Sequence, residues 1–137
     1  MATSITGGCA CGAVRYEFSA DPVFAANCHC RDCQRATGGS SASFFAVPKT
    51  AVKTIGEVKY RDFKAESGNT VSRGFCPNCG SRLMGRSTLA PDLLMIMPGS
   101  LDDPSWYKPA IDVWTSSAQP WDHMNPALPK FPKNPPM

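Results

Sequence analysis

Short segments that alternate apolar and polar residues, or are apolar throughout, recur along the chain and predict β-strands. Residues 13–18 alternate, whereas residues 43–47 and 93–97 are almost entirely apolar. The predicted strands are residues 13–18, 23–26, 43–47, 52–55, 58–63, 70–75, 82–85, 93–97 and 111–115. Gly56 and Glu57 separate two of them and predict a hairpin turn. The sequence therefore predicts a mainly β fold of many short strands.

Helical signals are confined to two places. Residues 31–37 predict one short helix, because Gly38 and Gly39 follow this segment and glycine commonly ends helices. A second helical turn is expected near residues 102–107. Glycine and proline contribute 11 and 13 of the 137 residues, which favours turns over long helices.

The length of 137 residues fits one domain, which we place at residues 1–119. Residues 120–137 form a tail that holds six of the 13 prolines, so it cannot supply a helix or a central strand. Two alternatives fit this composition: an extended tail laid over the domain surface, or a frayed end.

Composition and charge exclude several classes of protein. Hydrophobic residues at 42% and charged residues at 18% argue against disorder. The longest purely apolar run is the five residues 93–97, so a membrane-spanning helix is not expected. Residues 1–8 lack the basic flank and apolar stretch of a secretory signal, which predicts a cytoplasmic protein. The formal charge of +3 is too small to indicate a nucleic-acid partner.

Seven cysteines are the unusual feature of the composition. An odd number cannot form a complete set of intramolecular disulfides, and a reducing compartment favours metal binding or catalysis. The cysteines fall into three groups, which are Cys9 with Cys11, Cys28 with Cys30 and Cys33, and Cys76 with Cys79.

The first and third groups each place two thiols close together and follow the second thiol with a glycine, which permits a tight turn. Two such turns can close a tetrahedral shell of four thiolates around a structural zinc; the alternative is four unconnected buried cysteines. The middle group then has three thiols and no partner pair. Three ligands with an open fourth position are typical of catalytic zinc. A second structural zinc completed by a histidine, or three free thiols, are the alternatives.

Other polar and aromatic residues give weaker signals. His29 lies between two predicted ligands in an extended segment, so its side chain should point away from the metal into a supporting or surface role. His123 is expected at the surface. Five arginines near the cysteines could bind carboxylates of an anionic ligand, although solvated side chains are the commoner case; they are Arg31, Arg35, Arg73, Arg82 and Arg86. The aromatic residues expected in the core are Phe44, Phe45, Trp106 and Trp114.

Three segments of the sequence, residues 8–16, 28–38 and 73–81, resemble the glutathione-dependent formaldehyde-activating enzyme family, whose domain is shared with centromere protein V. Residues 99–104 and 111–115 also resemble it, so the similarity covers nearly the whole chain. The resemblance implies an Mss4-like mainly β fold with two zinc ions per chain. It implies a structural zinc on Cys9, Cys11, Cys76 and Cys79, and a catalytic zinc on Cys28, Cys30 and Cys33.

The resemblance further implies that the chain joins glutathione to formaldehyde, giving S-hydroxymethylglutathione, which is formally a carbon–sulfur lyase reaction in reverse. No matched motif identifies residues that bind the small thiol. A zinc-stabilised protein-binding module without catalysis is the alternative function. A zinc hydrolase is disfavoured, because three thiolates make a weak Lewis acid and no evident glutamate base adjoins the cluster.

Overall fold

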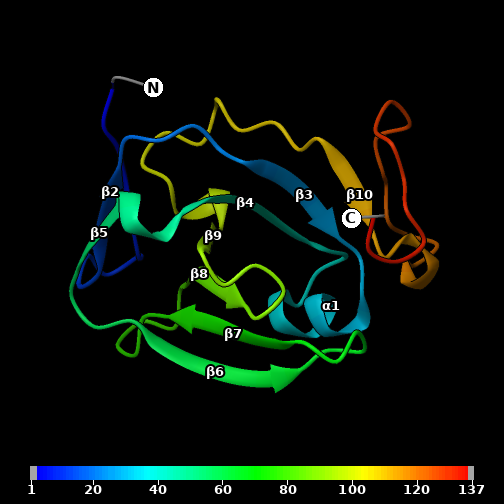
Figure 1. Cartoon of the computed structure of the whole chain (residues 1–137), viewed down its shortest axis with the longest axis horizontal. Coiled ribbons are helices and arrows are strands. Elements are labelled where there is room, and N and C mark those ends of the chain that lie inside the picture. Colours follow the sequence, from blue (N-terminus) through cyan, green and yellow to red (C-terminus); the bar gives the residue numbers. More distant parts are fainter. Residues whose placement is uncertain (1–2, 136–137) are drawn as a thin grey trace.

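The computed structural model describes residues 3–135, and its strands form two sheets (Figure 1). The small sheet is built from β1 (Ile5–Gly8), β2 (Arg15–Phe18) and β5 (Val52–Ile55), in that order. The strands of the larger sheet are β3 (Phe24–Cys28), β4 (Ala42–Pro48), β6 (Lys59–Lys64), β7 (Thr70–Phe75), β8 (Arg82–Ser87), β9 (Leu93–Ile96) and β10 (Ile111–Val113). Their order across the sheet is β10-β3-β4-β9-β8-β7-β6. The prediction of a mainly β chain is confirmed, and the architecture is consistent with an Mss4-like fold.

One α-helix, α1 (Arg31–Thr37), occurs within residues 3–135, and it has the predicted bounds. The Cys30 sulfur accepts the Cys33 amide at its start, and Gly38 at φ 73° ends it in the left-handed region. Three short 3₁₀ turns complete the described elements: η1 (Lys49–Ala51), η2 (Pro98–Ser100) and η3 (Thr115–Ser117). The turn expected near residues 102–107 is a single turn, closed by the Tyr107 amide on the Pro104 carbonyl at 3.2 Å.

The larger sheet carries apolar side chains on both faces. On one face, Phe45 and Ile96 are fully buried, and Phe45 contacts Phe18 of the small sheet with ring centroids 5.8 Å apart. These side chains form the core between the two sheets. The residues that alternate with them, Phe44 and Met95 among others, face the opposite side and line a cavity. Figure 1 shows α1 between the β3–β4 and β6–β7 parts of this curved sheet.

A β-bulge between β7 and β8 changes which face the β8 side chains occupy. Gly74 pairs with Met84, but Phe75 pairs with Arg82, so Leu83 is an extra residue on β8. Leu83 and Met84 are therefore both buried in the core. The inserted residue places Arg82 on the cavity face, as bulges often do beside functional sites.

The predicted hairpin at Gly56 is wrong. β5 pairs with β2 and β6 pairs with β7, so the chain crosses at Gly56 from the small sheet to the larger one. Gly56 has a φ of +92°, and a Cβ at this position would lie 2.1 Å from the Ala13 carbonyl oxygen. Strand β1 was not predicted, because its sequence, Ile5–Gly8, ends in two glycines and gives almost no pattern.

The C-terminal tail lies along β10, as the orange and red segments of Figure 1 show. The Asp112 amide donates to the Pro129 carbonyl at 2.9 Å, and the Phe131 amide donates to the Asp112 carbonyl at 2.9 Å. Of the two alternatives for the tail, the structure has the extended one for residues 120–135, while residues 136–137 lie outside the described part. The domain boundary at residue 119 stays a prediction. Within the described residues, none of the helices is long and apolar enough to cross a membrane.

The close approach at Gly56 leads to a prediction about stability. Gly56→Ala and Gly68→Ala both place a side chain at positive φ, +92° and +89°, which costs about 1–2 kcal/mol. Only the alanine Cβ at position 56 would also clash with a backbone atom, because nothing lies within 4 Å of a Cβ at Gly68. We expect Gly56→Ala to lower the free energy of unfolding by about 1–3 kcal/mol more than Gly68→Ala, measured by urea denaturation. Equal losses would show that the Ala13 contact is relieved without cost.

Candidate functional site

The structure brings four predicted ligands together at the junction of the two sheets. Cys9 and Cys11 lie in the β1–β2 loop, whereas Cys76 and Cys79 lie in the β7–β8 turn. All four sulfur atoms are within 4.8 Å of one another. This group, called here the four-cysteine cluster, could hold a metal ion, and its four thiols match the donor set of a closed tetrahedral site.

Local backbone geometry explains how the turns present these thiols. Gly12 and Gly80 follow the second cysteine of each pair, at φ +81° and +80°. The Val14 amide donates to the Cys9 sulfur at 3.3 Å, and this contact lowers the pKa of Cys9. Hydrogen bonding to Ser81 lowers the pKa of Cys79 to about 5. These contacts therefore favour the thiolates of Cys9 and Cys79, the form that binds metals.

The middle group of cysteines lies at the junction between the end of β3 and the start of α1. Cys28 is the last residue of β3, Cys30 caps the helix and Cys33 lies in its first turn. Their sulfur atoms are also within 4.8 Å of one another, and we call them the three-cysteine cluster. Hydrogen bonds from the Cys28 and Cys33 thiols lower the pKa of Cys30 to about 2, whereas the contact with Cys30 raises the pKa of Cys28. Negative charge therefore concentrates on the Cys30 sulfur.

Two of the five arginines expected near the cysteines face this cluster. Arg73 Nη2 lies 4.0 Å from the Cys33 sulfur, and its guanidinium stacks 3.7 Å above the Phe63 ring. Burial lowers the pKa of Arg82, and its Nε is buried with no hydrogen-bond partner in the described part of the chain. The positive charges offset the negative sulfur atoms. Elsewhere, Arg86 stacks on Tyr60, and the remaining two arginines are exposed.

A cavity of about 560 Å³ extends from the three-cysteine cluster over the open face of the larger sheet. Phe44 and Trp114 line it, although both were expected in the core. The prediction was wrong for Phe44 because it alternates with buried Phe45 and so points to the opposite face. Trp114 follows β10 in the left-handed conformation, at φ 58°, which turns it out of the strand. Phe45 is in the core as predicted, and Trp106 packs against it.

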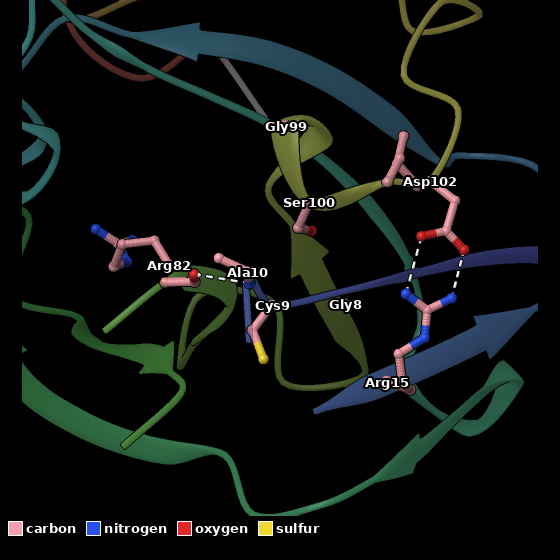
Figure 2. Close-up of a pocket in the computed structure, with 10 residues that line it drawn as sticks. Gly8, Cys9, Ala10, Arg15, Arg82, Gly99, Ser100 and Asp102 are labelled. Carbon is pink, nitrogen blue, oxygen red and sulfur yellow. Dashed lines mark hydrogen bonds and ion pairs between the residues drawn. The ribbon is translucent and has the colours of Figure 1, made fainter. Parts of the chain in front are cut away.

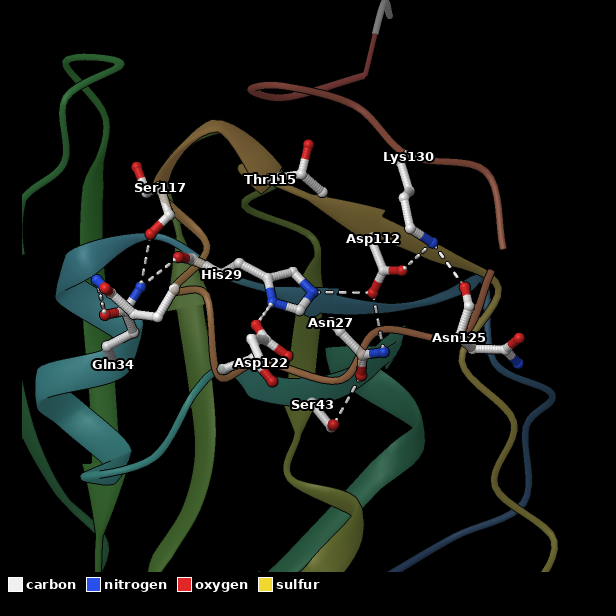
Figure 3. Close-up of polar contacts among 12 residues, drawn as sticks. Asn27, His29, Gln34, Ser43, Asp112, Thr115, Ser117, Asp122, Asn125 and Lys130 are labelled. Atoms are coloured by element: carbon white, nitrogen blue, oxygen red, sulfur yellow. Dashed lines mark hydrogen bonds and ion pairs between the residues drawn. The ribbon is translucent and has the colours of Figure 1, made fainter. Parts of the chain in front are cut away.

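His29 holds the loop of the three-cysteine cluster through a buried polar network (Figure 3). Its Nε2 lies 2.9 Å from Asp112 on β10, and its Nδ1 lies 2.5 Å from Asp122 in the tail. Each ring nitrogen therefore has a carboxylate oxygen within hydrogen-bond distance. His29 points away from the cysteines, as predicted, but it is 2% exposed, so a surface role is wrong. His123 is exposed, as predicted.

Asp112 is the centre of this network. Burial would raise its pKa, but hydrogen bonds from His29, Lys130 and Asn27 together hold the pKa below its usual range. Lys130 Nζ also donates to the Asn125 carbonyl at 2.6 Å, which fixes the tail around the buried aspartate. The carboxylate therefore joins the cysteine loop to β10 and to the tail.

Gln34 provides a second tie between α1 and the C-terminal part of the chain. Its side-chain amide donates to the His29 carbonyl at 2.7 Å and to the Ser117 carbonyl at 3.0 Å. Sequence reasoning did not find Gln34, Asp112 or Asp122. A polar residue within the apolar strand 111–115 was a usable signal for Asp112, whereas Asp122 in the tail gave none.

A second hollow, of about 510 Å³, lies beside the four-cysteine cluster (Figure 2). Its charged residues include Arg15 and Asp102, which form a two-point ion pair across it. Thr6 also donates to the Asp102 carboxylate, at 2.6 Å. Because this arginine and aspartate satisfy each other, we take the cavity at the three-cysteine cluster as the candidate site.

Comparisons with known proteins identify a matching family and a similar fold. The family model described as glutathione-dependent formaldehyde-activating enzyme matches residues 4–117, which include all seven cysteines. A crystal structure of a Rhodobacter sphaeroides protein, a structural genomics target, is similar with a TM-score of 0.59. It is 16% identical, and the alignment covers 92% of this chain and 98% of that one, so the similarity concerns the fold alone. No curated protein matches the sequence.

The His29 network predicts unequal effects of two adjacent substitutions. Asp122→Ala leaves a buried imidazole nitrogen without its hydrogen-bond partner and should lower the free energy of unfolding by about 1–3 kcal/mol. His123→Ala removes an exposed side chain next to it and should change stability by less than about 0.5 kcal/mol. Urea denaturation of both variants measures the difference. Equal stabilities of the two variants would contradict a structural role for the tail contact.

Proposed function

The chain belongs to the glutathione-dependent formaldehyde-activating enzyme family, and we propose that it adds a small thiol of the glutathione type to formaldehyde. The observation that carries this proposal is that the family match includes the three-cysteine cluster, which lies at the end of a cavity large enough for a substrate. The enzyme would be a carbon–sulfur lyase of the S-hydroxymethylglutathione synthase type. Its many free cysteines suit a reducing compartment, which supports a cytoplasmic location.

The proposed reaction balances without any oxidant or reductant. The thiol sulfur bonds to the aldehyde carbon, the carbon–oxygen double bond becomes a single bond, and the thiol proton ends on the oxygen. The same bond breaks in the reverse direction. The protein therefore needs to supply a thiolate, hold it next to the carbonyl carbon and stabilise the charge that moves to oxygen.

Two zinc ions per chain are part of the proposal, because the donor sets fit this metal. The four-cysteine cluster would hold a structural zinc with Cys9, Cys11, Cys76 and Cys79. The three-cysteine cluster would hold a catalytic zinc with Cys28, Cys30 and Cys33, leaving a fourth position for substrate. Zinc bound there would act as a Lewis acid and lower the pKa of a substrate thiol, so that the thiolate is present at neutral pH.

The surrounding residues support this chemistry in three ways. Arg73 and Arg82 place positive charge beside Cys33, which offsets the charge of a further thiolate. His29 fixes the loop between Cys28 and Cys30, so the sulfur atoms keep their spacing. The apolar walls of the cavity exclude water from the reacting carbon.

The two clusters should respond differently to loss of a ligand. Cys76→Ser opens a closed shell whose metal-binding energy is folding energy, so we expect loss of cooperative folding. Cys33→Ser should remain folded and retain one zinc, compared with two in the native protein. Elemental analysis of zinc per chain and thermal unfolding measure both effects. A native protein that saturates at one zinc would refute the two-site assignment, and a Cys33→Ser variant as unstable as Cys76→Ser would favour a binding module.

Catalysis can be tested against its spontaneous background. Glutathione and formaldehyde combine without an enzyme, so a rate measurement at equilibrium is needed. NMR exchange spectroscopy should show faster exchange between free and hydroxymethylated glutathione with native, zinc-loaded protein, and no acceleration with Cys33→Ser. The same exchange rate with and without native protein would exclude this substrate pair.

A further inference from the structure

The cavity that meets the three-cysteine cluster is mostly apolar. Side chains on the open face of the larger sheet form its floor, because every second residue of β3, β4 and β9 points into it. The apolar residues among them include Phe24, Phe44, Leu93, Met95 and Met97. Phe24 and Phe44 pack edge to face, with ring centroids 5.7 Å apart. An apolar floor of this kind binds apolar ligand groups.

The cavity is much larger than formaldehyde requires. Formaldehyde has two non-hydrogen atoms, and a single water molecule takes up about 30 Å³ of the liquid. The cavity of about 560 Å³ lies within the range of roughly 300–1,000 Å³ that holds drug-sized ligands. Formaldehyde would therefore fill little of the cavity, and a polar, charged thiol such as glutathione does not match the apolar floor.

The two arginines and the large apolar side chains occupy different ends of the cavity, and the Glu66 carboxylate on the lining is exposed and paired with Lys133. Arg73 and Arg82 lie near the three-cysteine cluster. Phe24 begins the strand that Cys28 ends, so the two positions are separated by ~13 Å along β3 at ~3.3 Å per residue. Leu93 lies at the same far end as Phe24. On β4, Phe24 pairs with Ala46 and Leu93 pairs with Pro48, two residues further along the strand. A ligand that spans the cavity would place a polar, sulfur-bearing end at the cysteines and an apolar end over Phe24 and Phe44.

We propose that the enzyme acts on aldehydes that carry an apolar substituent, a medium-length alkyl chain or an aryl group, which lies on this sheet face. The inference rests on the proposed function, because it takes the three-cysteine cluster as the place where the substrate sulfur binds. The step is the same balanced addition: sulfur bonds to the aldehyde carbon, and the thiol proton ends on the carbonyl oxygen. The product is a thiohemiacetal whose substituent lies in the cavity and whose polar thiol part remains near the arginines.

Two stable analogues of such adducts test the idea without turnover. S-hexylglutathione and S-methylglutathione are thioethers that differ only in the length of the apolar group. Each buried methylene contributes about 0.8 kcal/mol, equivalent to about fourfold in affinity, so several buried methylenes should make the hexyl compound bind at least tenfold tighter. Isothermal titration of zinc-loaded protein gives both dissociation constants. Equal affinities would overturn the proposal.

Methionine labelling locates the bound hexyl group independently of the affinity measurement. With ¹³C-methyl methionine, the hexyl compound should shift the resonances of Met95 and Met97, which line the cavity, and leave Met84, buried in the core, in place. The methyl compound should shift Met95 little. Tight binding of the hexyl compound that leaves both cavity methionines unchanged would place the ligand elsewhere and also overturn the proposal.

A matched pair of variants distinguishes binding in the cavity from binding to apolar surface elsewhere on the protein. Met95→Gln keeps the length of a cavity side chain but makes it polar, and should weaken hexyl binding by about tenfold with little change for the methyl compound. Ile55→Asn alters a residue that is 73% exposed outside the cavity, and should change neither affinity. Equal effects of the two variants would contradict the proposed orientation.

The outcomes also distinguish this inference from the proposed function. Exchange between glutathione and formaldehyde without selective hexyl binding would support the family activity and overturn the apolar substrate class. Selective hexyl binding at Met95 without acceleration of formaldehyde exchange would support the apolar site and exclude formaldehyde as the electrophile.

Discussion

Side chains alternate between the two faces of a β-strand, so a strand that is apolar throughout needs apolar surroundings on both sides. In this protein, β9 is such a strand and β4 is one apart from Ser43, and the two faces of these strands are used differently. Phe45 and Ile96 pack against the small sheet and close the core. Phe44 and Met95 remain on the open face, where they form the floor of the cavity. The same short sequences thus build the folded core and the surface on which a substrate can lie.

The two cysteine clusters differ in what they connect. The four-cysteine cluster joins a loop of the small sheet to a turn of the larger sheet, and the Ala10 amide donates to the Ser81 hydroxyl beside it. A metal there would act as a cross-link between sheets, much as a disulfide would. The three-cysteine cluster belongs to a single loop and helix start, and other residues hold that loop: His29, Gln34, Asp112 and Asp122. The loop of the three-cysteine cluster therefore keeps its position without help from a metal. Such a loop suits a site that exchanges a ligand.

Much of the fold and of the cysteine grouping could be predicted, because both follow from local spacing. The helix 31–37 was correct in its bounds, since Gly38 marks its C-terminal end, whereas the cap at Cys30 was seen only in the structure. The hairpin at Gly56 was wrong because a glycine turn does not specify which strands pair, and β5 pairs with β2, which is distant in the sequence. Phe44 was misplaced because an apolar run does not show which face is covered. The partners of His29 lie 83 and 93 residues away in the sequence, beyond the reach of any local pattern.

Those long separations have a consequence for biosynthesis. Protein chains grow at about 5–20 residues per second, so the 93 residues between His29 and Asp122 take roughly 5–20 s to be made. During that interval the loop with Cys28, Cys30 and Cys33 lacks the contacts that fix it, and its thiols are open to oxidation or to the wrong metal. A reducing environment would therefore protect these thiols until translation has supplied the two aspartates.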